Sequence, residues 1–552
     1  MSNYRHIKDL VLRHKTKYIL GMLSVLAVDI LQLALPKVLG IITDLLKDRA
    51  LDRKSLLMYC SLVLLLALGI AFFRFFWRYL VMGASRKIET ELRNRFYAHL
   101  QKLSVNYFNT HKTGDLMAHA TNDIQNIRMA LGPGITMSTD SAIIPLAAIV
   151  MMFITGGPLL TLVSCLPFAA LVASVLTFVK LMHSRVRKVQ EAFSRLTETA
   201  RENFSGIRVV KSFVQEESEA VKFRKINEHN REMNIKYIRL MSMLFPAITT
   251  ISALSFALAL WFGGRHVILG HISLGDFVAF TSYLSMLTWP VSALGWITSM
   301  FQRGSVSLKR INKILDEEPE IADGSDPYPS FSIKGRIEIR NLSFCYPGSN
   351  RPVLKNINVT IERGKTLAIV GKTGSGKTTL VNLLLRLYNV PEGTIFIDGV
   401  DICRIPLSTL RRNIGYAPQD SFLFSTTIKQ NIDFFRNLSD DEIVEAAKTA
   451  NVYDNIMDFP DRFETMVGER GITLSGGQKQ RISIARALLG NPPVIILDDC
   501  LSAVDTQTEE KILEGLKGVI SHKTSIIISH RISSLKNADE IIVLEDGEIA
   551  ER

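Results

Sequence analysis

The first half of the chain contains six long apolar stretches, and this feature constrains the fold more than any other. In lipid every backbone N–H and C=O group needs a partner within the protein, so an apolar stretch of about 20 residues predicts a membrane-spanning α-helix. An even number of crossings places both ends of this half on the same side of the bilayer. The predicted spans lie at about 18–45, 55–83, 130–155, 158–181, 242–264 and 276–300.

Composition supports a membrane half and a soluble half. Of the 552 residues, 47% are hydrophobic, which is high for a soluble enzyme. The formal net charge of +12 does not predict a nucleic-acid partner, because the basic residues gather beside the apolar spans, as they do in cytoplasmic loops. The first 17 residues form a basic amphipathic stretch that we expect on the cytoplasmic membrane face, without the features of a secretory signal. The five scattered cysteines show no metal-ligand spacing.

Four ionisable residues interrupt the apolar spans. A charge in lipid is costly, so each is expected to face a cavity or another polar group, or to reach the interface. Asp29 and Asp140 are the two that we expect to line a pathway. The four are Asp29, Arg74, Arg78 and Asp140.

The connections after the second and fourth spans are long and charged, with apolar residues at helical spacing, so we expect the membrane helices to continue into the cytoplasm. Each contains a break with a short amphipathic insert, one around Gly114 and Asp115 and one around Gly206. Two ordinary helical hairpins are the alternative. A linker with three prolines runs from Asp316 to Ser330. It separates a transmembrane domain, predicted at 1–324, from a second domain at 325–552.

The second domain alternates β-rich and helical runs, as an α/β domain does. The apolar run TLAIVG is followed by GKTGSGKTT and then by a helix-like segment. Glycines allow the tight path that turns N–H groups toward phosphate oxygens, a lysine neutralises the phosphates, and a threonine hydroxyl binds Mg²⁺. This phosphate loop is predicted to bind ATP through Gly371, Gly374, Ser375, Gly376, Lys377, Thr378 and Thr379.

A second motif, LSGGQKQR, stands shortly before the acidic strand VIILDD. A serine and two glycines at the start of a helix offer a hydroxyl and bare N–H groups to a γ-phosphate. By itself the motif could be a polar loop with a capped helix, but its distance from the phosphate loop and acidic strand argues against that. It resembles the ABC signature, and the residues predicted to contact nucleotide are Ser475, Gly476, Gly477 and Gln478.

Taken together, these motifs resemble the exporter-type ABC transporters over essentially the whole chain. The resemblance implies a six-helix transmembrane domain followed by a P-loop NTPase domain of ABC type, with ATP and Mg²⁺ as cofactors. It implies that the two inserts are coupling helices resting on the ATP-binding domains. It also implies that Tyr346 stacks on adenine, that Gln419 and Asp498 bind Mg²⁺ with Thr378, that Asp505 signals between two sites, and that His530 is the γ-phosphate switch.

The chain departs from the family pattern at Asp499, where a glutamate would polarise the attacking water. The shorter side chain withdraws the base by more than an ångström, and misplacement on that scale costs about 10²-fold in rate. The pattern also continues past Arg552 with another helix, so we expect a longer natural chain. The residues predicted to serve hydrolysis, in this site or in a partner's, are Asp499, His530, Gln419, Ser475 and Gly477.

ATP sites in this family form between the phosphate loop of one domain and the signature of another. An impaired site and an intact signature in one chain favour a subunit of a heterodimeric bacterial multidrug exporter over a homodimer. The partner is then a second half-transporter with a glutamate base and an altered signature. The expected function is export of amphipathic compounds or lipids across the plasma membrane. The alternatives are an ATP-gated channel or a regulatory subunit, and a soluble ATPase is excluded by the apolar spans.

Overall fold

The chain forms two compact units in the computed structural model. The structure describes residues 5–323, 328, 331–468, 474–502 and 504–552. Unit 1 consists of Met1–Leu100 and Gly114–Asp316, and unit 2 consists of Gln101–Thr113 and Glu317–Arg552. The predicted domain boundary between residues 324 and 325 lies outside the described residues and stays a prediction.

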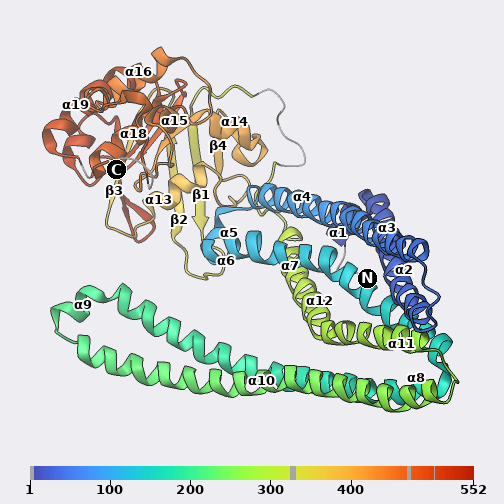
Figure 1. Ribbon diagram of the computed structural model, residues 1–552. Helices are drawn as coiled ribbons and strands as arrows, with labels where there is room; N and C mark the ends of the chain where they lie inside the picture. The colour runs from blue at the N-terminus through green and yellow to red at the C-terminus, as the bar shows by residue number, and fades with distance from the viewer. Residues whose placement is uncertain (1–4, 324–327, 329–330, 469–473, 503) are drawn as a thin grey trace. The chain divides into compact units, whose positions relative to one another are not determined.

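The described residues of unit 1 form α-helices joined by short connections and by three π-helical turns (Figure 1). The elements are α1 (Arg5–Arg13), α2 (Lys15–Lys47), α3 (Arg53–Trp77), η2 (Arg78–Met82), α4 (Gly83–Leu100), α6 (Thr113–Ala118), η3 (His119–Asp123), α7 (Ile124–Met129), η4 (Ala130–Gly134), α8 (Ile135–Ser205), α9 (Ile207–Ser212), α10 (Glu216–Ile268), α11 (Leu274–Met286) and α12 (Thr288–Leu315).

Within the described residues, five helices are long and apolar enough to cross a bilayer. The third and fourth predicted spans share one of them, Thr113–Ser174, which has 62 residues. At ~1.5 Å per residue this helix is about three times as long as one crossing requires. Its backbone leaves the helical conformation at Gly157 (φ 76°, ψ 171°), between the two predicted spans. The third and fourth predicted spans are therefore two helices that meet at Gly157, which keeps the number of crossings even.

Small residues let two membrane helices approach closely. A Cβ added to Gly275 of α11 would lie 2.0 Å from the backbone oxygen of Gly40 in α2. Asp44 accepts hydrogen bonds from Gly275 N and Ser273 Oγ, both at 2.6 Å, and the buried Tyr283 donates to Leu33 O at 2.9 Å. Close backbone contact and internal hydrogen bonds are what hold helices together in lipid.

The first intracellular insert differs from the prediction. It is the short helix α5 (Val105–Thr110), which belongs to unit 2, whereas Gly114 and Asp115 lie in the first turn of the returning helix α6. The polar residues after Asp115 do not break the helix because the chain continues through the wide π-helical turn η3. The insert therefore begins at Val105, before the polar segment around Gly114 where it was predicted.

The second insert, α9, directly follows Gly206 and lies at the far end of the long hairpin that α8 and α10 form side by side (Figure 1). None of the residues of α9 is buried. The apolar side chains at this hairpin tip that are exposed are Phe204, Ile207, Val209, Phe213 and Val214.

Unit 2 contains two sheets. The smaller is antiparallel, with strand order β2-β1-β4-β5. The larger has the order β10-β9-β3-β8-β7-β6, and its strands are parallel except for the edge strand β10. The strands are β1 (Ile337–Phe344), β2 (Leu354–Ile361), β3 (Thr366–Gly371), β4 (Ile395–Ile397), β5 (Val400–Asp401), β6 (Ile414–Ala417), β7 (Val494–Asp498), β8 (Thr524–Ile528), β9 (Glu540–Glu545) and β10 (Glu548–Glu551).

Helices pack around these sheets. Besides α5, the helices of unit 2 are α13 (Lys377–Leu384), η5 (Ile402–Arg404), α14 (Leu407–Arg412), α15 (Ile428–Asp433), α16 (Asp440–Thr449), α17 (Tyr453–Met457), η6 (Arg462–Glu464), α18 (Gly476–Leu488), α19 (Thr506–Ile520) and η7 (Ile532–Leu535).

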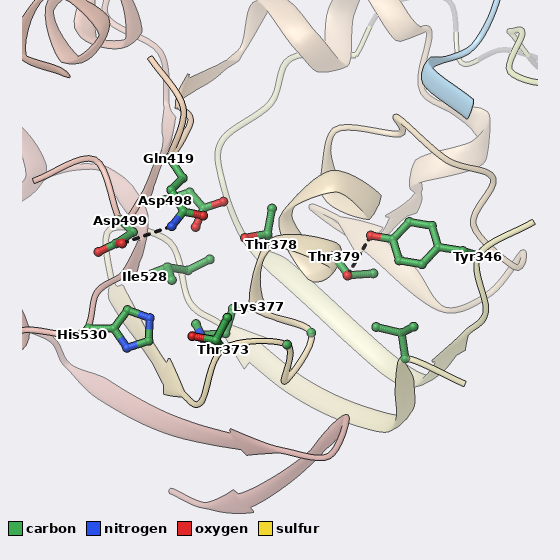
Figure 2. A pocket seen from close by; sticks show the side chains of 13 residues that line it. Tyr346, Thr373, Lys377, Thr378, Thr379, Gln419, Asp498, Asp499, Ile528 and His530 are labelled. Carbon is green, nitrogen blue, oxygen red and sulfur yellow. Dashed lines mark hydrogen bonds between the residues drawn. The ribbon is translucent and has the colours of Figure 1, made fainter. Parts of the chain in front are cut away.

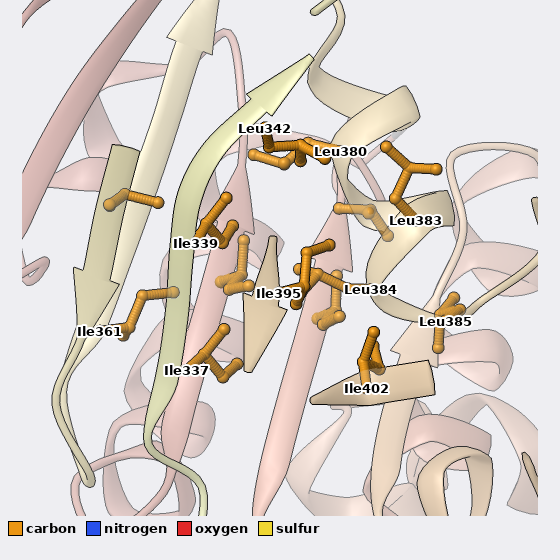
Figure 3. Packing of buried hydrophobic residues seen from close by; sticks show 14 of the residues in the cluster. Ile337, Ile339, Leu342, Ile361, Leu380, Leu383, Leu384, Leu385, Ile395 and Ile402 are labelled. Atoms are coloured by element: carbon orange, nitrogen blue, oxygen red, sulfur yellow. The ribbon is translucent and has the colours of Figure 1, made fainter. Parts of the chain in front are cut away.

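The main core of unit 2 fixes the helix that follows the phosphate loop. Leu342 of β1 lies beside Leu380 of α13, and Ile337, Ile339 and Leu383 belong to the same buried cluster (Figure 3). All five are buried, and full burial of such a side chain contributes about 1.5–3 kcal/mol. This packing anchors α13, and with it the phosphate loop at its N-terminus.

Candidate nucleotide-binding site

The phosphate loop joins β3 to α13 and lines a cavity of about 330 Å³. Gly374 and Gly376 have φ values of 85° and 105°, a conformation that favours glycine. A Cβ on Gly376 would lie 2.7 Å from the Leu354 side chain. The loop delivers the chain to the N-terminus of α13, where free N–H groups and the positive end of the helix dipole favour an anion.

Figure 2 shows the side chains that line this cavity, with Tyr346 and Thr379 on one side and Asp498, Asp499 and His530 on the other. The loop residues lie between them. The cavity therefore has an aromatic ring at one end and carboxylates at the other. Predicted site residues that line the cavity are Tyr346, Gly374, Gly376, Lys377, Thr378, Thr379, Gln419, Asp498, Asp499 and His530.

Lys377 lies over the phosphate loop. Its ammonium donates hydrogen bonds to the backbone oxygens of Gly371 (2.7 Å) and Lys372 (2.8 Å), which leaves the third N–H for a phosphate oxygen. Burial lowers the pKa of Lys377, and Asp498 and Asp499 act in the opposite direction. A bound polyphosphate would offset the cost of burying this ammonium group.

The acidic end of the cavity fits a divalent cation. Asp498 ends β7 with only 1% of its surface exposed, and burial raises its pKa. Among the described residues, its Oδ2 and the buried Oγ of Ser375 have no hydrogen-bond partner. A carboxylate oxygen in this state, beside the Thr378 hydroxyl that also lines the cavity, is the oxygen donor set that Mg²⁺ prefers. When bound, Mg²⁺ would neutralise phosphate charge.

Asp499 follows the strand in a left-handed conformation, with φ of 44°. Its N–H donates to Ile528 O at 2.8 Å, and its Oδ2 accepts from Gln419 Nε2 at 3.4 Å (Figure 2). Aspartate is among the few residues with a side chain that tolerate this conformation. The backbone and Gln419 together hold the short carboxylate at the edge of the cavity.

Tyr346, at the opposite end, is held from two sides. Its hydroxyl hydrogen-bonds with Thr379 Oγ1 at 2.9 Å, and its ring packs edge to face on Tyr388, with centroids 5.0 Å apart. Tyr388 is buried, and its Oη accepts a hydrogen bond from Asn109 Nδ2 of α5 at 2.9 Å. Tyr388 therefore contacts both the expected adenine-stacking ring and the first insert.

Further side chains attach the first insert to unit 2. Glu320 accepts hydrogen bonds from Ser104 Oγ and Asn106 Nδ2, both at 3.0 Å. Within the insert, the ring of the buried Tyr107 stacks on His111 with centroids 4.1 Å apart. These contacts explain why α5 groups with the nucleotide-binding unit.

The signature helix α18 begins with a complete capping box. Ser475 Oγ accepts from Gln478 N, and Gln478 Oε1 accepts from Ser475 N at 2.9 Å. Gly476 and Gly477 form the first turn, and none of the described signature residues lines the phosphate-loop cavity. Asp505, which caps α19, also lies outside that cavity. Hence the chain carries two separate groups of predicted nucleotide contacts.

Several residues near the site were missed by the sequence analysis. Val353, Thr373 and Ile528 line the cavity, and Tyr388 and Asn109 meet although 279 positions separate them. Thr373, inside the phosphate loop, is the one that motif spacing could have revealed. Two predicted loop residues, Gly371 and Ser375, support the loop and do not line the cavity.

A phosphate loop, a buried acidic strand end and a capped signature helix define an ATP-binding domain of ABC type, here on a chain with membrane-spanning helices. Comparison with known families agrees. Residues 18–291 match the ABC transporter transmembrane region, and residues 354–502 match the ABC transporter family.

The chain is also similar over nearly its whole length to individual ABC transporters. The chain is 36% identical to the probable multidrug resistance ABC transporter ATP-binding/permease protein YheI of Bacillus subtilis, covering 97% of this chain and 92% of that protein. It is 34% identical to the ATP-dependent lipid A-core flippase of Syntrophus aciditrophicus, covering 100% and 91%. A bacterial Atm1-family ABC exporter solved with ATP bound matches with a TM-score of 0.78 and 28% identity, covering 99% and 95%.

The chain belongs to the ABC transporter family, and its architecture is that of an exporter half-transporter. It is a multi-pass plasma-membrane protein with a cytoplasmic, ATP-hydrolysing nucleotide-binding domain. The predicted fold class is thereby confirmed.

Proposed function

We propose that this chain is one subunit of a heterodimeric exporter that moves amphipathic compounds across the plasma membrane by alternating access. The observation that carries the proposal is the combination, within one chain, of an intact signature with Asp499 at the position where a glutamate base is expected. Names of relatives, which include multidrug and lipid exporters, support the substrate class.

In this proposal the cavity binds ATP and Mg²⁺ and hydrolyses ATP slowly. Tyr346 stacks on adenine, the phosphate loop with Lys377 holds the β- and γ-phosphates, and Thr378, Gln419 and Asp498 hold Mg²⁺. The Gln419 amide that contacts Asp499 restrains the carboxylate at a point where one methylene is missing. A base held back by more than an ångström costs about 10²-fold in rate, while nucleotide binding is unaffected.

The signature serves the partner's site. Ser475 and Gly477 present a hydroxyl and free N–H groups at the start of α18, a position that favours a γ-phosphate. We propose that the partner supplies the phosphate loop and a glutamate base that face this helix, and that its hydrolysis resets the transport cycle. Two copies of this chain would have two slow sites.

We further propose that the second insert docks on the partner's ATP-binding domain. The apolar side chains Val209 and Phe213 at the hairpin tip are exposed, and helices this long do not bury such residues alone. Unit 2 offers a matching surface, an exposed aromatic cluster in which Phe424 contacts Phe422 and Phe434. The equivalent cluster of a partner would receive α9.

The membrane unit contains a cavity suited to an amphipathic substrate. It measures about 350 Å³, lies among α8, α10 and α12, and its lining is mostly aromatic and aliphatic, with Arg303 as the charged group. Such a surface selects by size and apolar area more than by hydrogen bonding. Representative lining residues are Phe178, Met182, Tyr237, Trp296 and Arg303.

A reconstituted transport assay tests this function. The tagged chain is purified from its native membrane with its bound second subunit and reconstituted into proteoliposomes, and an amphipathic dye and ATP are added outside. ATP-dependent accumulation of the dye against its gradient is expected. Passive ion conductance without accumulation would instead identify an ATP-gated channel or channel-associated subunit.

A further inference from the structure

A cavity of about 340 Å³ in unit 1, remote in sequence from the nucleotide site, has basic side chains at half of its lining positions. It forms where the start of α2 meets η2 and α4. None of the described residues that line it is acidic. Its charged side chains are Lys17, Arg78, Arg86 and Lys87, and Tyr79 lies among them.

Most of this positive charge lacks compensation. Arg86 is paired, because it donates to Glu89 Oε2 at 3.1 Å. By contrast, the ammonium groups of Lys17 and Lys87 lie close enough to repel each other, and among the described residues neither they nor Arg78 form an ion pair. Two like charges held close together repel each other, which costs free energy. An anion bound between them would attract both ammonium groups. Cytoplasmic lysines and arginines that merely follow the positive-inside rule have no reason to converge on one cavity.

The cavity lies where the apolar part of its helix ends. Arg78 directly follows α3, and Phe72 and Phe75 of α3 and Tyr79 of η2 are exposed, as lipid-facing side chains are. The π-helical turn η2 widens the helix here, and a Cβ built on Gly83 has no atom within 4 Å. Since the chain that follows α4, Gln101–Thr113, belongs to the nucleotide-binding unit, this end of the span is the cytoplasmic one. An anion in the cavity would therefore lie at the level of the lipid headgroups.

We infer that this cationic cavity binds the phosphate headgroup of an anionic phospholipid of the cytoplasmic leaflet. Lys17, Arg78 and Lys87 contact the phosphate, and the acyl chains lie along the exposed apolar face of α3. The occupant bridges the start of α2 to α4 and removes the repulsion between Lys17 and Lys87. A soluble phosphate has the same charge but no acyl chain to place against α3.

Native mass spectrometry of the purified complex in detergent measures this binding directly, and it does not depend on ATP hydrolysis. The complex is titrated with phosphatidylglycerol or phosphatidylcholine. The wild type is expected to retain phosphatidylglycerol preferentially. Replacing Lys17, Arg78 and Lys87 together by Gln should weaken that binding about 100-fold, at roughly fivefold for each basic residue. A matched variant removes the same charges from exposed positions elsewhere in unit 1: Lys188→Gln, Arg195→Gln and Lys225→Gln.

A second pair of variants tests the cavity without changing charge. Gly83→Phe fills the open space and should abolish the preference, whereas Gly83→Ala should preserve it. Equal loss in the matched charge variant, or full retention in both Gly83→Phe and the triple variant, would overturn the proposal. Inorganic phosphate at millimolar concentration should not displace the lipid. Displacement by phosphate alone would overturn the lipid assignment and identify a soluble anion as the occupant.

Discussion

The nucleotide-binding unit presents two surfaces to ATP, the phosphate-loop cavity and the start of the signature helix α18, and they differ in completeness. The cavity has its loop, lysine and buried carboxylate, but Asp499 stands where a longer base is expected. The signature helix has every family residue and a closed capping box between Ser475 and Gln478. This difference is the basis of our proposal that this chain supplies the signature of a fast site whose base belongs to a second subunit.

The largest expected effect comes from damaging the signature. Gly477→Asp places a carboxylate in the first turn of α18, where it would repel the γ-phosphate, and ATPase activity of the complex should fall at least 10²-fold, equivalent to about 2.7 kcal/mol. Steady-state phosphate release measures it. Ser408→Asp, at the same position of the exposed first turn of α14, is the control and should keep wild-type activity. Similar losses in both variants would remove the special role of the signature.

A change at the second insert should break coupling and leave both nucleotide surfaces intact. Phe213→Asp puts a charge at the exposed hairpin tip, which cannot then be buried against aromatic side chains, so substrate-stimulated ATPase activity should fall about tenfold while basal activity persists. Lys211→Gln, which alters a solvent-exposed ion pair with Glu216, serves as the control. If stimulation survives Phe213→Asp, the tip does not dock on a partner.

The first insert gives a smaller effect. Tyr388→Phe keeps the ring against Tyr346 but removes the hydroxyl that accepts from Asn109. Loss of one such hydrogen bond costs about 1 kcal/mol, so substrate stimulation should fall about fivefold with unchanged affinity for ATP. Asn109→Ala should add nothing in the Tyr388→Phe background, because both changes remove the same bond. Additive losses would show that the two residues act separately.

Replacing Asp499 by the expected glutamate should raise the ATPase activity of the complex slightly. Asp499→Glu adds the missing methylene and turns the slow site into a second fast one, so total phosphate release should rise by about twofold, the gain expected when one active site becomes two. Trapping of a labelled nucleotide then appears in this chain as well as in its partner. An unchanged rate and trapping in the partner alone would mean that more than side-chain length limits this site.

Much of the fold and site could be predicted because the informative residues are contiguous. The phosphate loop, LSGGQKQR and VIILDD each combine strand, loop and helix signals within a few residues, and all three have the predicted local structure. Contacts between distant segments left no such signal. The sequence around Tyr388 predicts only the end of a helix. No residue near it in the sequence indicates the contact with Asn109. The first insert lies earlier than predicted because the polar residues around Gly114 continue as helix through a π-helical turn. The break between the third and fourth spans was predictable, because two glycines and a proline stand together where the helix ends at Gly157.

Substituting the base and the signature in parallel tests the central claim most directly. Phosphate release is measured for complexes carrying either Asp499→Asn or Gly477→Asp in this chain, with the partner unchanged. The account predicts a loss of less than threefold for Asp499→Asn, because that residue belongs to an already slow site, against at least 10²-fold for Gly477→Asp. Equal and severe losses from both substitutions would show that Asp499 is a competent base, and the chain would then be half of a symmetric homodimer.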